Sequence, residues 1–275
     1  MKKLIYTLVA VSVWGFGFWF HFYEKHNSPQ IQKPIDIVGF DDIEKKGTII
    51  QKKNVDPVIF QINETNVKIK SFSCKDLKVK LKQGNNSYGL DGYFIYEKPL
   101  NFRMVLKSIR GVELDIGSNN THFWFWSKSM RPAALYYARH GHAKDTRLRD
   151  PFDPVWIMSS LGIETLNLDA KFVKTADKIY VSQDVISPRG RALIRSAVIT
   201  DKISAYYLFN KNNQFVTITQ ISRDSQGIPN KIYTSWKEED VSMEFIFDNA
   251  KINTIAEREM FVMPNHAQKI DLEHY

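Results

Sequence analysis

The sequence contains almost no cysteine. Among its 275 residues, Cys74 is the single one. One thiol excludes a disulfide within the chain and a metal site built from several cysteines. Cys74 also lies too deep in the chain to carry the lipid of a lipoprotein processed at its N-terminus, so we exclude that kind of anchor. We expect Cys74 to be a small core residue.

Motifs for catalysis and nucleotide binding are also missing. The chain has no G-x-S-x-G, no P-loop and no G-x-G-x-x-G. Its acidic clusters, Asp41-Asp42 and Glu238-Glu239-Asp240, lie in polar turn contexts typical of solvated caps. No repeat with a fixed period of about 20–50 residues is visible, which argues against a propeller or a solenoid. We therefore expect a protein that is not an enzyme.

The composition is that of a folded, basic chain. Hydrophobic residues make up 43% and charged residues 25%, and Lys plus Arg exceed Asp plus Glu by 38 to 30. A positive balance permits nucleic-acid binding, but the lysines are spread along strand faces, as at Lys78, Lys80 and Lys82, and no recognition motif accompanies them. We expect no nucleic-acid partner and attribute the charge to contact with anionic lipid headgroups.

The first 23 residues are apolar and indicate membrane insertion. Lys2 and Lys3 precede Leu4–Phe20, a stretch without charge. At ~1.5 Å per residue it reaches about 26 Å, and residues 21–23 complete a span of the ~30 Å hydrocarbon core. The lysine pair predicts a cytoplasmic N-terminus and an exported body. The segment is either an uncleaved signal anchor in the inner membrane or a signal peptide cleaved near Gly15-Phe16-Gly17, and a buried core helix is the third reading.

The segment that follows separates this anchor from the main domain. Residues 24–36 are polar and contain Pro29 and Pro34, which is typical of a linker. We therefore divide the chain into a membrane segment at 1–23, a linker at 24–36 and one domain at 37–275. A short helix over 35–46 is compatible with the sequence where the linker meets the domain.

From Val55 onward, apolar and polar residues alternate with period two, which predicts strands. Val67 and Ile69 alternate with lysines, as do Leu77 and Val79. Short turns rich in Gly and Asn separate the strands, and connections of this length favour antiparallel hairpins over parallel crossovers. The expected strands, about eleven or twelve in number, include 77–82, 88–96, 102–108, 111–116, 121–127, 133–138, 178–185, 193–200, 204–209, 214–222, 231–236 and 241–247.

One helix is expected to interrupt the sheet. Asp153 is a suitable N-cap, Pro154 suits the first helical position and Gly162 can end the helix. The residues between them, among them Trp156 and Met158, are apolar around most of the helix. Such a helix must be buried beneath the sheet or fill a cavity.

The most aromatic strand is 121–127. Phe123 and Phe125 lie on one of its faces, and Trp124 and Trp126 lie on the other. A strand with one face in water would not carry bulky aromatic residues on both faces. Either both faces are covered, or one lines a ligand cavity.

Several of these segments, taken in order, resemble the LolA/LolB-like periplasmic lipoprotein carriers, in particular a divergent bacterial branch. The resemblance extends over roughly residues 50–265. It is carried by Tyr96-Glu97-Lys98-Pro99 with Phe102-Arg103, Asp115-Ile116-Gly117-Ser118-Asn119 with Phe123-Trp124-Phe125-Trp126, Pro151-Phe152-Asp153-Pro154, Ile228-Pro229, Ile252-Asn253 and Phe261-Val262-Met263-Pro264.

The resemblance implies a mainly β fold: an unclosed antiparallel β-barrel of about eleven strands around helices that act as a lid or plug. It implies that the half-barrel binds the acyl chains of lipoproteins or lipids in the cell envelope and can transfer them, with no cofactor. Each buried CH₂ would contribute about 0.8 kcal/mol. Arg103 is then expected to contact a headgroup or the lid. The expected lining of the lipid cavity is Phe123, Trp124, Phe125, Trp126, Trp156 and Met158.

Other interpretations remain open at this point. The same sheet, packed solid, would suit a structural module that binds a protein partner. His140-Gly141-His142 with Asp145 and Asp150 lacks a third ligand at a defined spacing, so we expect a loop and no metal. The basic segment 188–191, taken with Arg195, is either a site for anionic headgroups or a solvated loop.

Overall fold

The computed structural model describes residues 47–50, 56–140, 154–186, 192–212, 214–238 and 240–274. The predicted membrane segment 1–23, the linker 24–36, the acidic pair 41–42, the helix cap Asp153 and the basic segment 188–191 lie outside the described residues.

Within these ranges, no helix has both the length and the apolar character needed to cross a membrane.

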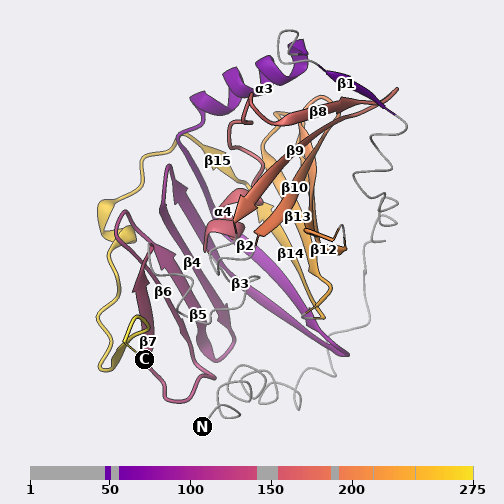
Figure 1. Ribbon diagram of the computed structural model, residues 1–275. Helices are drawn as coiled ribbons and strands as arrows, with labels where there is room; N and C mark the ends of the chain where they lie inside the picture. The colour runs from indigo at the N-terminus through magenta and orange to yellow at the C-terminus, as the bar shows by residue number, and fades with distance from the viewer. Residues whose placement is uncertain are drawn as a thin grey trace.

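The described strands form one open, curved sheet (Figure 1). Its order is β1-β8-β9-β10-β11-β12-β13-β14-β2-β3-β4-β5-β6-β7-β16, with β15 paired to β2. Adjacent strands are antiparallel except for β16, which runs parallel to β7. Since β1 and β16 end the path without pairing to each other, the sheet is unclosed, as predicted.

All twelve strands expected from the sequence are present, within a few residues at each end, except that the first begins six residues earlier than expected. They are β2 (Ser71–Gln83), β3 (Asn86–Glu97), β4 (Asn101–Ser108), β5 (Gly111–Ser118), β6 (His122–Ser127), β7 (Leu135–Arg139), β9 (Ile179–Ile186), β10 (Ala192–Ile199), β11 (Ile203–Asn210), β12 (Phe215–Arg223), β13 (Pro229–Trp236) and β14 (Val241–Asp248).

Four short strands were not expected, so the count of about eleven was too low. They are β1 (Thr48–Ile50), β8 (Lys171–Lys174), β15 (Lys251–Ile252) and β16 (Lys269–Asp271). Each has only two to four residues. Segments this short show too little alternation to be recognised from sequence.

The prediction of a strand at Val67–Ile69 is wrong, because residues Pro57–Lys68 form helix α3. Pro57 occupies its first turn, and Asp56 caps it by accepting a hydrogen bond from the backbone N–H of Val58 at 3.0 Å. The buried residues Ile59, Ile62 and Asn66 have helical spacing. The helix cap and the helical spacing of the buried residues favour a helix more strongly than the short alternation at residues 67–69 favours a strand.

The core lies on the concave face of the sheet. On β14, the inward-facing residues Val241, Met243, Phe245 and Phe247 are all buried, whereas the residues between them are half-buried. The ladder places Phe245 opposite Val79 of β2 and opposite Ile232 of β13. Residues that face each other in this way share one side of the sheet.

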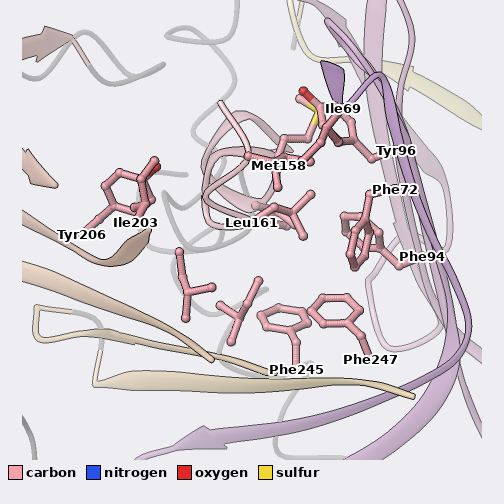
Figure 2. Close-up of a cluster of buried hydrophobic side chains, with 14 of the residues drawn as sticks. Ile69, Phe72, Phe94, Tyr96, Met158, Leu161, Ile203, Tyr206, Phe245 and Phe247 are labelled. Carbon is pink, nitrogen blue, oxygen red and sulfur yellow. The ribbon is translucent and has the colours of Figure 1, made fainter. Parts of the chain in front are cut away.

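Helix α4 (Pro154–Ser159) and the residues after it pack into this concave face. Met158 and Leu161 lie between side chains from different parts of the curved sheet (Figure 2). The aromatic part of this core is interlocked edge to face: Phe72 and Phe247 have ring centroids 5.2 Å apart, and Phe94 and Phe247 are 5.6 Å apart.

The helix ends near the residue expected from the sequence. Regular helix stops at Ser159, and Gly162 then adopts a φ of 64° in the left-handed region. Two turn hydrogen bonds connect the helix to Gly162, from Leu161 N to Met158 O at 3.2 Å and from Gly162 N to Ser159 O at 3.2 Å. A glycine adopts this conformation at little cost, which is why it suits the end of the helix.

We predict that Phe94→Ala lowers the free energy of unfolding by about 3–5 kcal/mol, because it leaves a cavity in the aromatic core. Phe94 is 1% exposed, whereas Phe60 on α3 is 58% exposed. The control Phe60→Ala should change stability by at most about 0.5 kcal/mol. Urea unfolding of the full chain measures both, and equal losses would contradict this assignment of the core.

We also predict a pH-dependent role for Asp56. Its carboxylate lies 2.6 Å from Lys174 Nζ, and this hydrogen bond lowers the pKa of Asp56 below its ordinary value. The charge therefore stabilises the fold above the unfolded pKa of about 3.9 and stops doing so as the pH falls through the folded pKa.

Asp56→Ala should cost about 1 kcal/mol at pH 7, whereas Asp56→Asn keeps a capping oxygen and should cost less. The difference between wild type and Asp56→Asn should shrink as the pH falls below about 4. Urea unfolding between pH 3 and 7 checks this, and a difference that grows with acidity would refute the role of the charge.

Candidate ligand pocket beneath helix α4

A pocket lies between α4 and the concave face of β10–β14. It has about 460 Å³ of empty space, counting the part open to solvent, but only about 30 Å³ can hold the centres of water-sized molecules. That smaller space suits about two waters. The lining residues are Trp156, Ile157, Ser159, Ser160, Arg195, Tyr206, Leu208, Thr217, Thr219, Thr234, Trp236, Met243 and Phe245.

One wall of the pocket is apolar. Trp156 of α4 meets Trp236 of β13 edge to face, with ring centroids 6.2 Å apart. Leu208, Met243 and Phe245 continue this wall on the sheet. The predicted cavity residue Trp156 therefore does line a pocket, whereas Met158 lies in the neighbouring core cluster.

The other wall of the pocket is polar, although its residues are buried on the concave face of the sheet. Thr217, Thr219 and Thr234 are buried there. Thr217 Oγ1 donates to the carbonyl oxygen of Ser235 at 2.6 Å, and the hydroxyls of Thr219 and Thr234 share a hydrogen bond at 3.1 Å. These threonines have strand propensity and also supply polar groups, so their alternation predicted a strand but not the polarity of its inner face.

Arg195 lies at the centre of this polar wall. The sequence grouped it with the basic segment 188–191, but it is an inward-facing residue of β10 and is buried. That grouping is wrong because the register places Arg195 opposite Leu208 of β11, within the ladder. Its guanidinium carbon lies 3.9 Å from the ring centre of Tyr206, which is a cation–π geometry.

The charge of Arg195 is compensated by the segment that follows α4, residues 160–166, which we call the lid segment. The Nη2 atom of Arg195 donates a hydrogen bond to Oε1 of Glu164 within an ion pair. Glu164 lies five residues beyond the end of α4. Burial opposes the charged form, but Glu164 and Tyr206 together raise the pKa of Arg195 above its ordinary value. Burial also raises the pKa of Tyr206 well above its usual value, and Glu164 adds to that shift. Both side chains are thus held in their usual protonation states.

The backbone of residues 162–166 is held by side chains of the surrounding elements. Arg223 Nη2 donates to the carbonyl oxygen of Gly162 at 2.9 Å, and Lys98 Nζ donates to that of Ile163 at 2.7 Å. On α3, Asn66 donates to the carbonyl oxygen of Glu164 at 2.7 Å, and Asn63 exchanges two hydrogen bonds with the backbone of Leu166. The segment after α4 is therefore anchored to the sheet and to α3. Lys98 is partly buried by these contacts, and burial lowers its pKa.

The four aromatic residues of β6 divide between the two faces of the sheet. Phe125 lies opposite Ile116 and packs against the main core, and Phe123 belongs to a smaller cluster with Ala138. Trp124 and Trp126 point to the convex face. A role for these four in lining a lipid cavity stays a prediction, and none of them lines the pocket beneath α4.

The convex face of β6 is covered by the C-terminal segment. Trp126 stacks on His266 with ring centroids 5.4 Å apart, and Asn119 donates to the carbonyl oxygen of Phe261 at 3.3 Å. Trp124 is fully buried against Gly117, where a Cβ atom would lie 2.2 Å from the indole ring. On this strand Trp124 is therefore fully covered, whereas Phe125 and Trp126 are half-buried.

Arg103 also lies on the convex face. It forms an ion pair with Asp115 at 2.8 Å and donates to the carbonyl oxygen of Met260 at 3.4 Å. These partners are on the side opposite α4, so the expectation that Arg103 contacts the lid is not met. Lys98, the residue after β3, makes that contact instead.

The remaining candidate residues have structural roles. Cys74 is buried, donates to the carbonyl oxygen of Asp248 at 3.3 Å, and its pKa is raised to about 11 by burial. His140 Nε2 lies 2.7 Å from the carbonyl oxygen of Asn119, while His142, Asp145 and Asp150 lie outside the described residues. No cluster of three metal-binding side chains occurs in the part of the chain that the structure describes.

No family model and no curated protein matches this chain. Among solved structures, it is similar to a LolA superfamily protein from Nitrosomonas europaea, with 8% identity over 75% of this chain and 96% of that one and a TM-score of 0.49. An outer membrane lipoprotein-sorting protein domain from Vibrio parahaemolyticus has 5% identity over 77% and 97%, with a TM-score of 0.46.

A third similar structure is the lipoprotein LppX from Mycobacterium tuberculosis, with 8% identity over 74% of this chain and 98% of that one and a TM-score of 0.31. These similarities, with identities of 5–8% and TM-scores below 0.5, do not identify a ligand.

We predict that Gly117→Ala destabilises the fold by about 1–3 kcal/mol, because the new methyl group would overlap the Trp124 indole. At Gly89, on β3 of the same sheet, an added Cβ atom would have open space within 4 Å. Gly89→Ala should therefore be neutral or slightly stabilising. Thermal unfolding followed by tryptophan fluorescence compares the two, and a neutral Gly117→Ala would show that the convex face is loosely packed.

Proposed function

We propose that this protein binds acyl chains of lipids or lipoproteins on the concave face of its sheet, beneath α4, and that it acts without catalysis. One observation carries the proposal. The apolar concave face of an open sheet is covered by α4 and the residues after it, not by a second sheet. A short helix can be replaced by a ligand without breaking the ladder of the sheet.

The energetics favour reversible exchange. Ile157, Met158 and Leu161 fill the concave face. An acyl chain that takes their place gains about 0.8 kcal/mol for each buried CH₂, while the displaced side chains lose a comparable amount. The net free energy of exchange is therefore small, because the gain from burying the acyl chain nearly equals the loss from exposing the displaced side chains. A small net free energy suits a carrier that must also release its ligand. The hydrogen bonds to residues 162–166 would keep the displaced helix attached.

The proposed location follows from the N-terminal segment. An uncleaved helix at 1–23 would tether the domain to the inner membrane, and the linker at 24–36 would hold it in the periplasm near the membrane surface. The positive charge of the chain would favour contact with anionic headgroups. Transfer of lipoproteins between membranes is one use of such a site.

A second candidate is a structural module that binds a protein partner. The observation that favours it is that water-sized molecules can occupy only about 30 Å³ beneath α4, since a domain packed solid needs no cavity. The two functions differ in whether α4 can be displaced by an acyl chain.

Binding of palmitate and native mass spectrometry of the full chain test the proposal. We expect lipid-sized adducts on the chain as purified and saturable binding of palmitate. Ser159→Trp should weaken binding roughly tenfold or more, because the indole fills the pocket that Ser159 lines and its displacement costs about 1–3 kcal/mol. Ser159→Ala is the matched control and should bind as wild type does. Absence of both adducts and palmitate binding would favour the structural module.

A further inference from the structure

The pocket beneath α4 has a charge that an acyl chain cannot satisfy. Arg195 is the single ionic side chain among the described residues that line it. Its side chain is 9% exposed and is held in a β-strand, so the guanidinium cannot turn out into water. A buried guanidinium without an anionic partner costs several kcal/mol.

At present the partner is Glu164, which belongs to the lid segment and not to the sheet. The Glu164 side chain is 35% exposed, so it has a path to solvent that Arg195 lacks. Its backbone is fixed by Asn66, which allows the carboxylate to swing away while the chain stays in place. Lys98 lies near enough to interact with Glu164 and would remain as a cation for the displaced carboxylate.

These observations bear on the ligand class, and the inference rests on the proposed function. We propose that the pocket takes an amphiphile with one anionic group, a carboxylate or a phosphate, that replaces the Glu164 carboxylate on Arg195 while its acyl chain replaces side chains of α4. In the absence of ligand, the Glu164 carboxylate therefore occupies the position on Arg195 that the anionic group of the ligand would take.

The surroundings of Arg195 suit such a group. Thr219 and Thr234 share one hydrogen bond between their two hydroxyls, so one of the two protons is not used in that bond and can be donated to an anion. The Tyr206 ring also contacts the Arg195 guanidinium, whose carbon lies 3.9 Å from the ring centre. On the apolar side, Trp236, Met243 and Phe245 provide a surface for the chain.

Two ligands with the same chain test the proposal with the full-length protein. Palmitate carries the anion, and hexadecanol does not. Wild type should bind palmitate at least about tenfold more tightly than hexadecanol, which is the effect expected of hydrogen bonds to a charged group. Inorganic phosphate without a chain should bind far more weakly than palmitate.

Two variants change the competition for Arg195 in opposite directions. Glu164→Gln removes the internal anion and should raise palmitate affinity about tenfold, with little effect on hexadecanol. Gln183 lies opposite Arg195 on β9. Gln183→Glu adds a second carboxylate there and should weaken palmitate binding by a similar factor. Thermal unfolding confirms that each variant is folded, and hexadecanol binding confirms that its chain site is intact.

The outcomes separate the two proposals. If hexadecanol and palmitate bind equally to wild type, the anion site is refuted while acyl-chain binding stands, and this comparison needs no variant. If neither binds, the proposed function fails and this inference with it. If inorganic phosphate binds as tightly as palmitate, the site takes a free anion and the amphiphile is refuted.

Discussion

An open sheet with an apolar concave face must cover that face, and the rest of this structure depends on that constraint. Phe72, Phe94 and Phe247 would face water if α4 and the residues after it were absent. Closing the barrel would solve the problem permanently, but the strand order leaves β1 and β16 unpaired with each other. A cover that includes the short helix α4 solves it while leaving that part of the face available to a ligand.

The cover is held at one end by polar contacts and elsewhere by apolar ones. Residues 162–166 are fixed through their backbone by Arg223, Lys98 and two asparagines of α3. In contrast, α4 itself contributes Ile157 and Met158 to the core. Hydrogen bonds are directional, whereas apolar burial can be supplied equally by any hydrocarbon. This division favours displacement of α4 with retention of the segment behind it.

Much of the fold could be predicted from the sequence, because alternation over six or more residues specified most of the long strands. The same rule misassigned Val67 and Ile69, where the Asp56 cap and Pro57 direct the chain into α3. The site was less predictable. The aromatic pattern of β6 is conspicuous in the sequence, yet Trp124 and Trp126 serve the convex face. Arg195 and Glu164 are 31 residues apart, and only the order of the strands brings them together.

In the proposed mode of binding, a bound acyl chain takes the place of α4. Hydrogen exchange of the full chain, measured with and without saturating palmitate, tests it most directly. We expect faster exchange across 154–161 when palmitate is bound. Exchange of the Leu166 amide should stay unchanged, because its hydrogen bond to the Asn63 side chain of α3 remains. Bound palmitate with unchanged or slower exchange across 154–161 would contradict it.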